Sequence, residues 1–216
     1  MAIKIENVVT PSAEQWEAII RGTRNPLNSW EKSDSTINAG FSGNSVIVGD
    51  NDLALMKKLV SAGTDHSKFM RMINVTVDIT APLYWWKEMD TYKVGTVRNS
   101  CSTMHTITNK EFELDDFSHE HLDTWGTNWL EQIIEVLNVG LESYLHSHDK
   151  DDWWQIIQLL PSSYNQRATV QMNYAVLRNM YHARKNHPLD EWKDFCRWIE
   201  SLPYSELITG GNADEM

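Results

Sequence analysis

The sequence predicts an α+β fold, in which a small antiparallel or mixed sheet is combined with several helices. The clearest strand signal lies in residues 73–80, which alternate apolar and polar side chains over four pairs. From about residue 119 to residue 201, by contrast, the apolar side chains recur mostly with helical spacing. The 216 residues suffice for one core, and neither an internal repeat nor a linker divides them. We therefore expect a single domain over residues 1–216.

The first quarter of the chain contains a strand, two helices and a long irregular segment. Residues 3–9 read as a short strand, and Ser12–Gln15 has the form of a capping box that opens a helix. Gly22–Asp50 is rich in Gly, Asn and Ser, so we expect a long loop, which is usually functional or mobile. A second helix is predicted over Asp52–Ala62, and Gly63 ends it.

The rest of the chain is predicted to be mainly helical. Pro82 closes the strand at 73–80 and fits an early helix position. Helices are expected at 83–90, 119–146, 153–160, 164–184 and 189–201. The apolar positions of the longest one are Trp125, Trp129, Ile133, Val136 and Leu137. The tail Thr209–Met216 is expected to be frayed.

Composition excludes several classes of protein. With 41% hydrophobic residues and ten Trp, the chain is not disordered. A formal net charge of −11 argues against non-specific binding of DNA, RNA or an anionic membrane. Two cysteines are too few for a disulfide framework, and no apolar run approaches 18 residues. We expect a soluble cytoplasmic protein that contacts no membrane.

The most informative segment is Thr91–His105, with the sequence TYKVGTVRNSCSTMH. It resembles the signature of flavin-dependent thymidylate synthases, which runs approximately R-H-R-x-x-S-x-N-x-x-S-x-R-Y. Tyr92-Lys93 stands in place of His-Arg, and Thr96 takes the place of the first Ser.

The second half of the signature matches after one inserted residue. The Asn, the second Ser and the Tyr of the motif then correspond to Asn99, Ser102 and His105, while Met104 replaces the last Arg.

Further motifs of the same family resemble segments of this chain in the same order. Gly63–Arg71 is similar to the family's segment G-H-x-x-x-F-x-H, which precedes a strand. Leu160-Pro161 resembles the family's Leu-Pro. Asn173–Arg184 is similar to N-x-R-x-L-x-[NH]-F-x-x-x-R without a gap, and Asp190–Trp192 lies near the position of a segment Ala-Gln-x-Glu. The resemblance therefore extends from about Asp52 to Trp198.

This resemblance implies a mixed α/β domain that assembles as a homotetramer. Family members bind FAD and dUMP at subunit interfaces and methylate dUMP with methylenetetrahydrofolate and reduced nicotinamide, in dTMP biosynthesis. They use no protein nucleophile, because the flavin carries the redox chemistry. No catalytic residue and no metal ligand is therefore assigned.

The resemblance also implies binding residues. The expected FAD ligands are His66, Lys68, Lys93, Thr96, Asn173 and Asn179. The expected contacts to a pyrimidine nucleotide are Asn99, Ser100, Ser102 and Arg184. Asn173 and Arg184 are eleven residues apart, about three helical turns or roughly 16 Å, which suits the two ends of a nucleotide.

Most of the family's arginines are missing at the matching positions. Their places are taken by Thr91-Tyr92, Met104, Ile157 and Ala175. One lost charge-assisted contact typically costs about 2–5 kcal/mol, so we expect dUMP methylation to be lost unless other cations compensate. The candidates for that role are Arg98, His105, Arg167, Arg178 and His182.

Simpler interpretations stay open beside these. His66 and Lys68 fit a solvated loop, Asn99–Ser102 fits a capped turn, and Asn173 and Arg184 fit packing against a neighbouring subunit.

Other side chains are expected to be structural. Cys101 is predicted to be a buried structural thiol, and the two His-x-His motifs at 119–121 and 146–148 to be solvated helix ends. The pairs Trp85-Trp86 and Trp153-Trp154 are predicted to lie in the core or at subunit contacts.

Two functional hypotheses follow. One is a flavin-dependent enzyme that acts on a pyrimidine nucleotide. The alternative is a catalytically inactive homologue that senses a nucleotide or binds another protein.

Overall fold

The computed structural model describes residues 3–40 and 43–210 and confirms the α+β fold class. The strands are β1 (Lys4–Val9), β2 (Thr36–Gly40), β3 (Gly43–Ile47), β4 (Asn74–Pro82), β5 (Thr96–Ser100) and β6 (Asn165–Asn173). Four of them form an antiparallel sheet in the order β1-β4-β6-β5, and β2 pairs with β3 in a separate antiparallel hairpin.

Nine α-helices and four short 3-10 helices occur in the described residues. The α-helices are α1 (Ala13–Arg24), α2 (Asp50–Ser61), α3 (Leu83–Met89), α4 (Thr103–Thr106), α5 (Thr124–Ser147), α6 (Lys150–Leu159), α7 (Tyr174–Arg184), α8 (Asp190–Glu200) and α9 (Glu206–Thr209). The 3-10 helices are η1 (Asn25–Leu27), η2 (Trp30–Lys32), η3 (Lys68–Arg71) and η4 (Leu114–Asp116). None of the helices in the described part of the chain has the length and apolar character needed to cross a bilayer.

The chain forms two compact units, and each is described by itself. Among the described residues, the first unit comprises 3–6, 78–91 and 98–169, and the second comprises 7–40, 43–77, 92–97 and 170–210. The expectation of a single domain over residues 1–216 remains a prediction.

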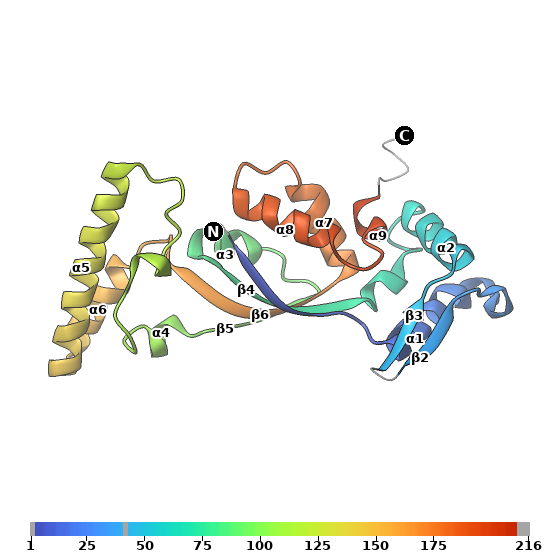
Figure 1. Cartoon of the computed structure of the whole chain (residues 1–216), viewed down its shortest axis with the longest axis horizontal. Helices are drawn as coiled ribbons and strands as arrows, with labels where there is room; N and C mark the ends of the chain where they lie inside the picture. Colours follow the sequence, from blue (N-terminus) through green and yellow to red (C-terminus); the bar gives the residue numbers. More distant parts are fainter. Residues whose placement is uncertain (1–2, 41–42, 211–216) are drawn as a thin grey trace. The chain divides into compact units, whose positions relative to one another are not determined.

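The first unit is built around α5 and α6, which pack side by side (Figure 1). The Asn138 amide of α5 accepts from Phe112 N at 2.8 Å and donates to Phe112 O at 3.0 Å, so it fixes the preceding loop on the helix. One buried apolar cluster of the unit consists of Ile107, Phe112, Phe117, Leu130, Ile134, Leu137, Leu141 and Ile156. Apolar burial of this kind, at roughly 25 cal/mol per Å², is the main force that holds the unit together.

The apolar face predicted for the longest helix was mostly wrong. The helix itself is confirmed as α5, but it buries Leu130, Ile134, Leu137 and Leu141. Trp125 and Trp129 are 76% and 61% exposed, and Ile133 and Val136 are also exposed. The helix therefore has two apolar faces, and the sequence pattern does not show which of them meets the core.

The second unit contains α1, α2, the β2–β3 hairpin and α7–α9. The strongly amphipathic α8 buries Trp192, Phe195 and Ile199. On α1, the Trp16 ring meets the Tyr204 ring edge-on with 5.0 Å between the ring centroids. These contacts pack the helices of this unit into one core.

Several local predictions are confirmed. Ser12 caps α1 in a complete capping box with Gln15, and β4 alternates buried and partly exposed side chains along its length. Gly63 follows α2 with a φ of +101°, a conformation that favours glycine. The end of the predicted tail, residues 211–216, lies outside the described residues.

Two element predictions were wrong. Gly22–Asp50 is not one long loop, because α1 continues to Arg24 and the β2–β3 hairpin follows, with Ile37 opposite Val46. Residues 164–184 do not form one helix, because β6 occupies Asn165–Asn173 before α7 begins. In β6 the side chains of Ala168, Val170 and Met172 are buried at a period of two, a signal that the neighbouring helical pattern concealed.

Candidate functional site

The segment Thr91–His105 falls partly in each unit, so its two halves are described separately. In the second unit, Arg184 at the end of α7 donates from Nε to Tyr92 Oη at 2.9 Å. The same guanidinium carbon lies 4.8 Å from the ring centroid of the buried Trp192 and 5.7 Å from that of Tyr92. An arginine at this distance from two aromatic rings is stabilised by cation–π attraction. The predicted nucleotide contact Arg184 is therefore bound within the unit.

The start of α7 lies beside the same half of the segment. Asn173 is the N-cap of α7, and its Oδ1 accepts from Val176 N at 3.1 Å. Gly95 turns the segment with a φ of +78°, and a Cβ there would come within 2.8 Å of Val176 Cγ2 and 3.0 Å of Asn173 Nδ2. Asn173 and Arg184 thus lie at opposite ends of α7, and the amide oxygen of Asn173 already serves the helix.

Thr96, which begins β5, differs from these residues. Its hydroxyl is buried, yet it has no hydrogen-bond partner among the described residues. A buried hydroxyl without a partner is uncommon and unfavourable, since its lost hydration is not replaced. Of the residues predicted to bind a cofactor, Thr96 is the one whose polar group is both buried and without a hydrogen-bond partner among the described residues.

The other half of the segment belongs to the first unit. Asn99 and Ser100 end β5 and are exposed, while Ser102 caps the one-turn helix α4 by accepting from His105 N at 3.3 Å. The capped-turn interpretation is therefore correct for Ser102. Cys101 is exposed, so the prediction that it is a buried thiol was wrong; the buried cysteine is Cys196.

Four of the predicted binding residues project into solvent. His66 and Lys68 lie in the turn before and at the start of η3, Lys93 lies in the segment after α3, and Asn179 lies on α7. Among the described residues, none of these four side chains makes a hydrogen bond or an ion pair. They are therefore available to a ligand.

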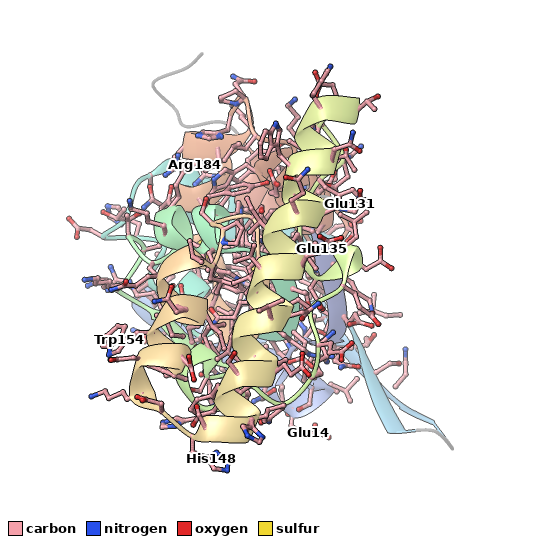
Figure 2. All side chains as sticks on the ribbon, turned by 90° about the vertical axis from the view of Figure 1, so that its left-hand side faces the viewer. Glu14, Glu131, Glu135, His148, Trp154 and Arg184 are labelled. Atoms are coloured by element: carbon pink, nitrogen blue, oxygen red, sulfur yellow. The ribbon has the colours of Figure 1, made fainter. Side chains whose placement is uncertain are left out.

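The two tryptophan pairs differ in exposure. Trp85 and Trp86 are buried, which agrees with the core interpretation, whereas Trp154 is 41% exposed on the outer side of α6 (Figure 2). Within residues 3–40 and 43–210, no three His, Cys, Asp or Glu side chains gather closely enough to hold a metal ion.

No protein-family model matches the chain, and no curated protein matches its sequence. Solved structures do match it along almost its whole length. The flavin-dependent thymidylate synthase ThyX of Helicobacter pylori, complexed with FAD and dUMP, aligns with a TM-score of 0.67 and 17% identity over 97% of this chain and 98% of that chain. The UMP/dUMP methylase PolB of Streptomyces cacaoi, bound with 5-Br dUMP, aligns with a TM-score of 0.66 and 14% identity over 96% of this chain and 94% of that chain.

The chain has the ThyX fold. A second structure of the Helicobacter pylori enzyme with FAD and dUMP gives a TM-score of 0.66 at 17% identity, over 97% of both chains. The family resemblance inferred from the sequence is thereby confirmed as a likeness of fold.

Within this ThyX fold, the arginines suggested as replacement cations are already engaged. In the first unit Arg98 binds both carboxylate oxygens of Asp90 at 2.7 Å and lies 4.0 Å over the Trp86 ring. Arg167 pairs with Asp78 at 2.8 Å. In the second unit Arg178 donates to the carbonyls of Ile208 at 2.8 Å and Gly210 at 2.6 Å, near the end of α9. None of the three arginines offers a free charge to a phosphate.

Sequence reasoning missed the aromatic partners of Arg184. Tyr92 was noted only as a substitute for a motif histidine, and Trp192 only as part of a weak motif. The sequence signal for this pairing was the number of aromatic side chains near Arg184, an arginine kept from the family motif. It could not reveal the pairing, because the residues concerned are 92 and eight positions from Arg184 in the sequence.

Proposed function

We propose that this chain is a ThyX-like protein that binds FAD, a pyrimidine deoxynucleotide such as dUMP, or both. The observation that carries the proposal is the alignment of almost the whole chain with ThyX structures that hold FAD and dUMP. The nucleotide-bound PolB structure, which aligns over a similar length, supports the same class of ligand.

Thr96 and Lys93 are the residues that best fit a ligand in this proposal. The buried Thr96 hydroxyl has a donor and two lone pairs to offer. Lys93 is exposed three residues earlier and makes no ion pair among the described residues. When bound, FAD would supply the redox chemistry, whereas the contribution of Thr96 and Lys93 is to bind and orient the ligand.

We further propose that dUMP methylation is altered or lost. A nucleotide phosphate is bound most strongly by charge-assisted, often bidentate donors. Arg98 is neutralised by Asp90, and Arg184 is held by Tyr92 and Trp192. The same observation favours the second candidate function, a catalytically inactive protein that senses a nucleotide or binds a partner.

A substitution that removes only the Thr96 hydroxyl tests ligand binding. Thr96→Val should leave the unliganded protein as stable as before or slightly more stable, since the buried hydroxyl has no partner to lose. The thermal stabilisation produced by FAD or dUMP should fall; it amounts to about 2.7 kcal/mol at 100 times Kd in the unsubstituted protein. Thr169→Val is the matched control, because that hydroxyl already donates to Asp78 at 2.6 Å.

Each outcome of this experiment is decisive. Two quantities are compared: the flavin absorbance retained after desalting and the stabilisation by dUMP. The proposed site is supported if either of them is reduced in Thr96→Val but not in Thr169→Val. Retained binding with equal stabilisation in both variants removes Thr96 from the site. Colourless protein that neither ligand stabilises overturns the binding proposal. Turnover of dUMP with FAD, methylenetetrahydrofolate and reduced nicotinamide would contradict the loss of methylation.

The homo-oligomer, expected to be a tetramer, is also a proposal. Trp125 and Trp129 lie exposed one turn apart on α5, and neighbouring exposed apolar side chains of this size can form part of an interface. Glu131 and Glu135 project from the surface of the same helix (Figure 2). If a second copy covers the tryptophans, the double variant Trp125→Ala/Trp129→Ala should reduce the mass measured by light scattering. An unchanged mass would place any interface elsewhere.

A further inference from the structure

The second unit contains a cavity that is formed by none of the residues of the proposed nucleotide site. It has a volume of about 340 Å³ and lies against α1, η2 and the β2–β3 hairpin. Its apolar walls are Ile20, Trp30, Ile37 and Val46. Cavities that hold small ligands have volumes from about 300 Å³ upward and combine apolar walls with a few polar groups.

A buried arginine supplies a polar group of this cavity. Arg24 is only 4% exposed and lines the cavity. Its Nε donates to Asp52 Oδ1 at 2.5 Å, and its Nη1 donates to the carbonyl of Ser29 at 3.2 Å. Among the described residues, its Nη2 amino group has no hydrogen-bond partner. Two N–H groups are therefore left for an acceptor inside the cavity.

Serine hydroxyls supply the complementary polar group. Ser33 and Ser35 line the cavity, and each hydroxyl donates to Asp52 Oδ2, at 2.6 Å and 2.5 Å. Ser35 Oγ also accepts from Gly49 N at 2.9 Å. Ser33 Oγ, which has already used its hydrogen, retains lone pairs that can accept from a ligand N–H.

The charges around the cavity cancel in pairs. Arg24 is balanced by Asp52, and Arg21 by Glu17 at 2.8 Å on the rim. A phosphate or another strongly charged group would therefore find no net attraction here. An uncharged ligand that offers both a carbonyl oxygen and an N–H matches the polar groups without leaving a buried charge unpaired.

We infer that this cavity binds a small, uncharged, planar heterocycle with a carbonyl next to a ring N–H. The carbonyl would accept from Arg24 Nη2, the ring N–H would donate to Ser33 Oγ, and the ring would lie among the apolar walls. The Trp30 indole that forms one wall is held in place by its hydrogen bond to Asn25 Oδ1, at 2.8 Å. Uracil, thymine, pterins and the flavin ring share this edge.

The experiment uses the full chain and three uncharged probes: thymidine, 6,7-dimethylpterin and riboflavin. Binding is measured by equilibrium dialysis and saturation-transfer NMR, and the probe that binds identifies the source of the shared edge. The control ligand 1,3-dimethylthymine keeps the carbonyls but has no ring N–H. It should bind about tenfold more weakly than thymidine if the N–H is used.

Two matched pairs of variants locate the binding. Val46→Trp fills the cavity, whereas Ile47→Trp places the same side chain at the next position of β3, which pairs with Thr36 and is 56% exposed. Trp30→Leu removes the aromatic wall, and Trp154→Leu removes an exposed tryptophan in the other unit. Binding should weaken at least about tenfold in Val46→Trp and Trp30→Leu and change less than about twofold in the controls.

The inference does not depend on the proposed function, and the same variants separate the two. Probe binding that persists in Thr96→Val but is lost in Val46→Trp supports the cavity, whether or not FAD or dUMP binds elsewhere. Absence of binding by all three probes overturns the inference. Equal binding in Val46→Trp and Ile47→Trp also overturns it, because the ligand would then occupy another site.

Discussion

Arg184 Nε donates a hydrogen bond to Tyr92 Oη at 2.9 Å and so ties the end of α7 to the segment that resembles the ThyX signature. In a ThyX-like chain this arginine was expected to face a nucleotide. Here its charge is placed over Trp192 and Tyr92, and the pairing contributes to the stability of the second unit.

Arg184→Ala should destabilise the protein by about 1–3 kcal/mol, because it removes a hydrogen bond and two cation–π contacts. Tyr92→Phe should cost less, about 1 kcal/mol, because the ring remains. Urea unfolding measures both values. If Arg184→Ala leaves stability unchanged but abolishes stabilisation by dUMP, the residue serves the ligand and not the fold.

Asn173→Ala should lower the unfolding free energy by about 1 kcal/mol, since the N-cap bond to Val176 is lost. Asn179→Ala on the exposed face of the same helix is the control and should change stability by less than about 0.5 kcal/mol. Equal effects in the two variants would show that the cap contributes nothing.

Gly95→Ala should cost about 2–4 kcal/mol, because it combines a positive φ with a clash against Val176. Gly63→Ala also has a positive φ, but a Cβ there meets nothing within 4 Å, so about 1 kcal/mol is expected. The difference in unfolding free energy between the two variants, measured by chemical denaturation, gives the cost of the clash with Val176. No difference would mean that the segment around Gly95 shifts freely.

The buried Arg24–Asp52 pair should make stability depend on pH in the acid range. Burial raises the pKa of Asp52, but hydrogen bonds from Ser33, Ser35 and Arg24 outweigh it and hold that pKa below its usual value. The unfolded chain therefore binds the proton more tightly, and this contribution, present above the unfolded-state pKa, is lost as pH falls through the folded-state pKa.

Asp52→Asn should accordingly flatten the fall of the unfolding free energy between about pH 5 and pH 2, the range in which a native-state carboxylate is titrated. At pH 7 it should also cost about 3–5 kcal/mol, because Arg24 loses its buried partner. Asp50→Asn, an exposed change on the same helix, controls for net charge. If the unfolding free energy falls with pH equally steeply in Asp52→Asn and Asp50→Asn, the pH dependence does not come from Asp52.

The two cysteines should differ in reactivity. Burial, with a smaller effect of Glu200, raises the pKa of the Cys196 thiol to about 11, whereas Cys101 is exposed. Iodoacetamide at about pH 8 should modify Cys101 in the native protein and reach Cys196 only after denaturation, since the thiolate is the reactive form. Mass spectrometry of tryptic peptides distinguishes the two sites. Rapid native modification of Cys196 would show that α8 opens readily.

The sequence determined the local features whose signals lie in neighbouring residues. The alternation of residues 73–80, the capping box at Ser12 and the stop at Gly63 all depend on short-range geometry, so they were predicted correctly. The order of the motifs also predicted the ThyX fold, because a shared fold preserves the sequence of its parts even at 17% identity.

Only the tertiary structure decided how distant residues pair. It showed that β6 forms as a strand between β4 and β5, and that α5 buries Leu130 instead of Trp129. It also placed Arg184 against Tyr92 and the buried Arg24 in the lining of a cavity. Strand pairing, the choice between two apolar faces and the neutralisation of a charge all depend on partners far away in the sequence, and no local pattern encodes them.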